Sequence, residues 1–144
     1  MKPRVNVVTL AVDDLERALA FYRDGLGLPT RGVIATQYAG TDTEPAGAVV
    51  FFELQGGLVL ALYPRTELAK DARVPPAPAS ALEFSLGVLA DSRQEVEDVL
   101  AQAAAAGGTV TDAPHDRPWG IYSGYFQDPD GHLWEIIWNP KTPG

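Results

Sequence analysis

The sequence predicts an α+β fold in which one arrangement, strand-helix-strand-strand-strand, occurs twice. In both halves an alternating strand pattern leads into an amphipathic helix that opens with a capping pattern and ends at glycines. A glycine also leads the last strand of each half, so residues 57–61 align with residues 131–135 and Ala61 matches Glu135. This internal repeat is the strongest evidence for the fold class.

The first half begins with a strand at residues 5–12, where apolar side chains alternate. Asp13 and Asp14 offer an N-cap for a helix whose apolar stripe runs to Leu26, before Gly27. Three more strands are expected, at residues 31–38, 48–54 and 58–63.

A proline-rich stretch then separates the halves. It is read as a connector, with room for one or two helical turns at residues 66–72. We therefore predict a single domain, residues 1–144. Its parts are module 1 at about residues 4–64, the connector at 65–79 and module 2 at about residues 80–140.

The second half repeats the order. A strand is expected at residues 81–90, and Ser92 with Glu95 forms the capping box of the next helix. A short strand at residues 109–111 and a loop at 112–118 follow. Residues 122–140 then form a hairpin around the turn Asp128-Pro129-Asp130-Gly131.

The last strand of this hairpin places one carboxylate among apolar residues. Trp134 and Ile136 share one face, and Glu135 and Ile137 share the other. A buried carboxylate is costly without a partner. Glu135 is therefore either a functional group or a residue at a wet edge.

Composition narrows the possible partners. The net charge of −8 argues against nucleic acid and against an anionic membrane surface. It suits either a cationic ligand or plain solubility. With no cysteine, the chain has no disulfide and no thiol nucleophile, and no apolar run is long enough to span a membrane. We expect a soluble, cytoplasmic protein without a signal peptide.

Two segments resemble the vicinal oxygen chelate superfamily, which includes glyoxalase I, bleomycin-resistance proteins and extradiol dioxygenases. They are VTLAVDDLERALAFYRDGLGL, residues 8–28, and YFQDPDGHLWEIIW, residues 125–138. The resemblance covers nearly the whole chain. It implies the glyoxalase/bleomycin-resistance/dioxygenase fold, with two βαβββ modules whose curled mixed sheets surround a cleft. It also implies a homodimer.

The resemblance further implies four metal-binding positions, from the first and last strands of each module, where the metal acts as a Lewis acid. The matching residues are Val7, Ala61, Ser85 (with Phe84 or Leu86 as neighbours) and Glu135. Only Glu135 is a normal ligand for zinc, nickel, manganese or iron. We expect no metal and no other cofactor. A rebuilt site from Glu83, Glu135 and His115 is the alternative.

The implied cleft is expected to bind a small organic ligand. The candidate ligand-binding residues are Thr9, Glu83, Ser85, Trp119, Tyr122, Tyr125 and Glu135. A pair of carboxylates in a poorly solvated site would raise the pKa of one of them and supply a general base or acid. Alternatively, Glu83 lies hydrated at the rim or pairs with an arginine such as Arg117, and the aromatic residues belong to the core.

Three functions remain open. The first is a metal-free, small-molecule-binding protein of the bleomycin-resistance type. The second is a metal-dependent enzyme of the glyoxalase or dioxygenase kind. The third is a metal-independent lyase or isomerase in which Glu135 is the catalytic base.

Overall fold

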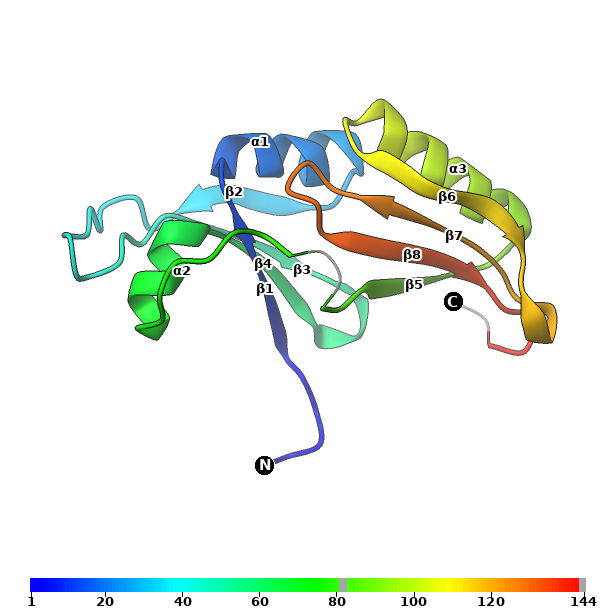
Figure 1. The fold of residues 1–144 in the computed structure, drawn as a ribbon, viewed down its shortest axis with the longest axis horizontal. Helices are drawn as coiled ribbons and strands as arrows, with labels where there is room; N and C mark the ends of the chain where they lie inside the picture. The colour runs from blue at the N-terminus through cyan, green and yellow to red at the C-terminus, as the bar shows by residue number, and fades with distance from the viewer. Residues whose placement is uncertain (81–82, 143–144) are drawn as a thin grey trace. The chain divides into compact units, whose positions relative to one another are not determined.

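The computed structural model describes residues 1–80 and 83–142, and it confirms the doubled βαβββ arrangement. The chain forms two compact units, Met1–Arg23 with Gly27–Pro78, and Asp24–Leu26 with Ala79–Gly144. Each unit holds one open, four-stranded mixed sheet and its helices (Figure 1). No helix in the described part of the chain is long and apolar enough to cross a membrane.

The first half of the chain supplies the main helices and strands of the first unit. They are β1 (Val7–Val12), α1 (Leu15–Leu19) with its π-helical continuation (Ala20–Gly25), β2 (Thr30–Ile34), β3 (Val49–Glu53), β4 (Val59–Pro64) and α2 (Arg65–Ala72). The sheet order is β1-β4-β3-β2, with β1 parallel to β4 and the other pairs antiparallel. The crossover through α1 is what allows β1 and β4 to run parallel.

The core of this unit lies between the sheet and α1. Asp14, rather than Asp13, caps the helix, because its carboxylate accepts the Arg17 backbone N–H at 3.0 Å. Tyr22, which is fully buried, packs against Phe52 of β3 with ring centroids 6.0 Å apart. The face of each sheet that lies away from α1 or α3 is called the far face below.

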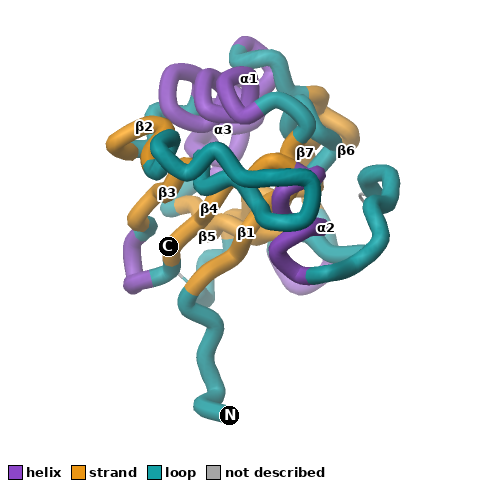
Figure 2. Tube along the Cα trace, turned by 90° about the vertical axis from the view of Figure 1, so that its left-hand side faces the viewer, coloured by secondary structure: helices purple, strands orange, loops and turns teal. Residues whose placement is uncertain are grey.

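The loop after β2 is held against α2. The predicted strand at residues 31–38 ends at Ile34, because Ala35 takes a left-handed φ of 61° that breaks the ladder. Glu67 of α2 accepts the Ala46 backbone N–H at 3.0 Å, and Lys70 donates to the Thr41 carbonyl at 3.0 Å. Both views of the chain show the loop and α2 side by side (Figures 1 and 2). The connector predicted at 65–79 thus begins with a true helix.

The second unit repeats the pattern with a longer helix and a longer edge strand. Its main elements are β5 (Leu86–Ala90), α3 (Arg93–Ala105), β6 (Thr109–Asp116), β7 (Tyr122–Gln127) and β8 (Leu133–Trp138). The sheet order is β5-β8-β7-β6, and only the β5–β8 pair is parallel. Ser92 caps α3 as predicted, accepting the Glu95 backbone N–H at 3.0 Å. Trp134 is buried on the α3 side and stacks on Phe126.

Two predicted boundaries in this unit are wrong. The strand expected at 81–90 covers only Leu86–Ala90; Glu83 and Ser85 precede it, and residues 81–82 lie outside the described part. In the loop expected at 112–118, residues 112–116 instead continue β6. The strand accommodates Pro114 because β6 is an edge strand with register shifts, where proline is tolerated.

The turn before β8 is closed by Asp128, which is only 4% exposed. Its carboxylate accepts the backbone N–H groups of Asp130 and His132, both at 2.9 Å, and lies 2.6 Å from His132 Nδ1. Gly131 supplies the positive φ of 91° that the reversal needs. His132 therefore has a structural role in the turn.

Gly124 of β7 is required by the irregular path of β6. A Cβ at this position would lie 2.9 Å from the Asp112 carbonyl oxygen and 3.0 Å from the Pro114 nitrogen. Both are backbone atoms and cannot move without shifting the bulged strand. We expect Gly124→Ala to lower the free energy of unfolding by about 1–3 kcal/mol, the usual cost of overpacking.

Denaturant unfolding of Gly124→Ala and of Gly87→Ala in β5 checks this expectation. A Cβ at Gly87 meets only the flexible Ile137 Cδ1, at 3.5 Å, so this variant is the matched control. Equal losses of stability in the two variants would contradict the role given to the bulge.

Candidate functional site

The far face of the second sheet carries a row of residues from all four strands. Glu135 of β8 pairs with Gly87 of β5 and with Tyr125 of β7, and Tyr125 pairs with Asp112 of β6. Residues paired in this way share a face. Gly87 has no side chain, and a Cβ at this position would lie 3.5 Å from Ile137 Cδ1.

The Glu135 carboxylate is half-buried and held by two hydroxyl groups. Ser123 of β7, which is fully buried, donates its hydroxyl to Glu135 Oε2 at 2.8 Å. Burial, and then the hydrogen bond with Glu135, raises the pKa of the Tyr125 hydroxyl. Tyr125 therefore stays protonated at neutral pH and donates to the carboxylate.

Arg117 continues this network toward the edge of the sheet. Its Nε donates to the Ser123 hydroxyl oxygen, so one buried hydroxyl stands between a guanidinium and a carboxylate. Its Nη2 donates to Asp112 Oδ2 at 2.8 Å, and its Cζ lies 5.3 Å from the Tyr125 ring centroid. Hydrogen bonds from Arg117 and His115 hold the pKa of Asp112 below its ordinary value.

His115 is the outermost member of the cluster. Its Nε2 lies 3.1 Å from Asp112 Oδ2, and its Nδ1 lies 3.0 Å from the Asp116 carbonyl oxygen. The continuous chain of contacts runs from His115 through Asp112, Arg117 and Ser123 to Glu135. It joins β6, β7 and β8 on one face.

The structure brings together only part of the predicted site. Tyr125 and Glu135 are in contact, whereas Glu83 and Ser85 are exposed residues ahead of β5. Thr9 lies on the far face of the first sheet, where it pairs with Ala61.

Two predicted aromatic residues lie away from Glu135. Tyr122 belongs to the α3 side of its sheet, where its hydroxyl donates to Glu97 at 2.7 Å. Trp119 is 84% exposed in the turn between β6 and β7.

Ser123 and Asp112 were not among the residues predicted for the site. Ser123 could have been found, because it is two residues from Tyr125 in the same strand and so shares its face. Asp112 could not, because the register shifts on both sides of it break simple alternation.

The residues present do not fit a superfamily metal site. At the four corresponding positions, Val7 and Ala61 lack a donor atom, Ser85 offers only a hydroxyl, and Glu135 already accepts two hydroxyl protons. Across residues 1–80 and 83–142, no three His, Asp or Glu side chains are grouped to hold a metal ion. The alternative set of Glu83, Glu135 and His115 is not gathered either.

Two tyrosines each have a pKa raised by one glutamate: Tyr125 by Glu135, and Tyr122 by Glu97. Replacing each glutamate in turn therefore tests one tyrosine while the other serves as the control. We expect Glu135→Gln to lower the pKa of Tyr125, because the variant removes the carboxylate charge that opposes phenolate formation. Glu97→Gln should instead lower the pKa of Tyr122, which is raised mainly by its hydrogen bond to Glu97. Tyrosine-labelled NMR from pH 8 upward measures both.

The raised pKa of Tyr125 also determines how its contribution to the free energy of unfolding changes with pH. The contribution of Tyr125 to folding is fully present below pH 10 and is lost as the pH rises through the raised value, since the unfolded chain ionises first. If Glu135→Gln left the pKa of Tyr125 unchanged, the contact would not have the electrostatic effect described.

Comparisons with known proteins agree with this architecture. The family model of the Glyoxalase/Bleomycin resistance protein/Dioxygenase superfamily matches residues 4–136. A glyoxalase-related enzyme from Fulvimarina pelagi is 31% identical, with a TM-score of 0.76 over 96% of this chain and 89% of that one. A lactoylglutathione lyase from Agrobacterium tumefaciens is 28% identical, with a TM-score of 0.65 and 96% of each chain covered.

A hypothetical protein from S. aureus, SA1046, shares the fold at 20% identity, with a TM-score of 0.73 over 96% of this chain and 95% of that one. The search of curated proteins found no match. The family model covers nearly the whole sequence, and both observed sheets have the topology of such proteins. The chain therefore belongs to the glyoxalase/bleomycin resistance protein/dioxygenase superfamily.

Proposed function

We propose that this chain is a small-molecule-binding protein whose second sheet holds an organic ligand against Glu135 without a divalent metal. The observation that carries the proposal is the state of Glu135. It is the only good ligand among the four metal positions, and it is already held by Ser123 and Tyr125. A carboxylate fixed in this way is a hydrogen-bond acceptor with a defined direction.

The surroundings of Glu135 favour a ligand that donates hydrogen bonds or carries a positive charge. A half-buried carboxylate attracts such groups more strongly than an exposed one, because less water screens it. The net charge of −8 adds a favourable long-range field for a cation. The Tyr125 ring offers an apolar surface beside it.

Arg117 is a nearby positive charge, but it does not extend the preference to anionic ligands. Its guanidinium is already satisfied by Asp112 and Ser123, so it is not free to bind an anionic group of the ligand. The positive charge instead fixes Ser123 and, through that hydroxyl, the Glu135 carboxylate. We infer that Arg117 is a positioning residue, not a ligand-binding one.

A metal-independent lyase or isomerase is the second candidate. Glu135 would take a proton from the substrate, and Tyr125 would give its hydroxyl proton to another substrate atom. The proton on Glu135 would then pass to the Tyr125 oxygen, which restores both groups. The similarity to a chain described as a lactoylglutathione lyase supports an enzyme, although a metal-dependent version lacks suitable donors here.

The assembly and location of the protein are also proposals. Val88 and Leu89 of the edge strand β5 are each 41% exposed, and such an apolar edge favours pairing with a second copy in a homodimer. We also propose a cytoplasmic location, with which a cysteine-free sequence is compatible.

Metal content tests the first part of the proposal. We expect protein purified without chelator to contain far less than one divalent ion per chain, because the donors required for tight binding are missing. Elemental analysis measures this directly, and chelator should leave the thermal unfolding midpoint unchanged. Nickel, zinc, manganese or iron at one ion per chain would overturn the proposal.

Native mass spectrometry tests the second part. We expect purified protein to carry a non-covalent organic adduct that is lost in Glu135→Gln, since the charge-assisted contact is removed. Glu97→Gln is the matched control, because Glu97 lies on α3 and contacts Tyr122 instead. Loss of the adduct in both variants would argue against a role for Glu135. Conversion of the adduct in the presence of chelator, absent in Glu135→Gln, would favour the lyase or isomerase.

A further inference from the structure

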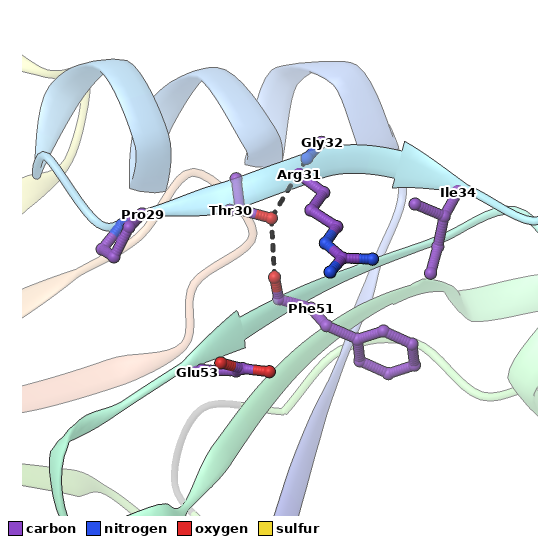
Figure 3. A pocket seen from close by; sticks show the side chains of 7 residues that line it. All are labelled: Pro29, Thr30, Arg31, Gly32, Ile34, Phe51 and Glu53. Atoms are coloured by element: carbon purple, nitrogen blue, oxygen red, sulfur yellow. Dashed lines mark hydrogen bonds between the residues drawn. The ribbon is translucent and has the colours of Figure 1, made fainter.

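The first unit contains a hollow that the proposed function does not use. It has a volume of about 510 Å³ and is lined by residues of the neighbouring strands β2 and β3. Arg31 and Ile34 of β2 line it together with Phe51 and Glu53 of β3. Figure 3 shows the Arg31 and Phe51 side chains extending from neighbouring strands toward the same side.

An irregular strand places Arg31 there. The register of β2 against β3 shifts between Thr30 and Val33, and Gly32 takes a φ of 81°. Thr30 secures the irregularity, because its hydroxyl donates to the Phe51 carbonyl at 2.6 Å and accepts the Gly32 N–H at 3.2 Å. Bulges of this kind redirect a side chain, and they are frequent beside binding sites.

The charged groups of the hollow have no partner in the described structure. Within residues 1–80 and 83–142, neither the Arg31 side chain nor the Glu53 side chain makes a hydrogen bond or an ion pair. In the second sheet, by contrast, Arg117 lies beside Tyr125 and is bound by Asp112. The first sheet thus has an arginine and an aromatic residue at one hollow, but no carboxylate is bound to this arginine in the described structure.

We propose that this hollow binds a small aromatic monocarboxylate that also carries a hydroxyl or amino group. The Arg31 guanidinium would take the carboxylate through two parallel hydrogen bonds, the geometry for which arginine is suited. Phe51, 42% exposed, and Ile34, 37% exposed, offer an apolar wall for the ring.

Glu53 sets the remaining specificity. Its carboxylate repels a second negative charge on the ligand and accepts a hydroxyl or amino proton instead. The hollow is built from residues of the first unit alone. The inference therefore goes beyond the proposed function, and it neither requires nor supports binding at Glu135.

The test is an NMR titration of the full chain with 4-hydroxybenzoate at physiological salt. We expect saturable shifts of the Arg31, Gly32 and Phe51 amide signals. Arg31→Gln should weaken the affinity about tenfold or more, as expected for loss of a charge-assisted pair. The affinity of Arg31→Lys should lie between those of wild type and Arg31→Gln, because lysine keeps the positive charge but lacks the planar guanidinium.

Two controls separate this site from a general charge effect. Arg4→Gln removes the same charge outside the hollow and should leave the affinity unchanged. The neutral probe 4-hydroxybenzyl alcohol should bind wild type and Arg31→Gln equally weakly. Equal affinity of 4-hydroxybenzoate for wild type and Arg31→Gln, shifts that map to other residues, or no saturable shift would overturn the proposal. None of these results bears on Glu135.

Discussion

The Ser123 hydroxyl group links the two charged side chains at the centre of the polar network on the second sheet, Glu135 and Arg117. It is fully buried, donates to Glu135 and accepts from Arg117. Without it, a half-buried carboxylate and a guanidinium would each lose a partner, at a cost that usually exceeds the net value of the bond itself. Ser123 also fixes which way Glu135 points, so the same contact would orient this carboxylate toward the ligand that we propose.

The two units show how one fold can be adapted by small changes. In both, a bulged outer strand and an aromatic residue on its neighbour (Phe51 or Tyr125) line the far face, and an arginine accompanies them. The second unit neutralises its arginine internally through Asp112, and the first does not. At the matching positions of the last strands, Ala61 stands where Glu135 stands. The same sheet topology thus holds an arginine paired with a carboxylate in the second unit. In the described part of the first unit, Arg31 has no such pair.

Local patterns predicted most of the fold, and register irregularities account for most of the errors. The turn residues predicted the hairpin of β7 and β8. The alternation of residue types correctly placed Glu135 and Trp134 on opposite faces of β8. The strand expected at residues 109–111 continues to Asp116, because an edge strand with register shifts tolerates Pro114. For the site, Glu135 and Tyr125 were found from their residue types. Ser123, Asp112 and the role of Arg117 depend on cross-strand register, which composition and spacing do not reveal.

A crystal structure of protein isolated without added ligand, measured with X-rays near the metal absorption edges, tests the central claim most directly. The claim is that Glu135 binds an organic group and not a metal ion. The account predicts electron density for an organic molecule in contact with the Glu135 carboxylate and no anomalous peak beside it. An anomalous peak about 2.0–2.2 Å from a Glu135 oxygen, the distance of a metal–carboxylate bond, would contradict it.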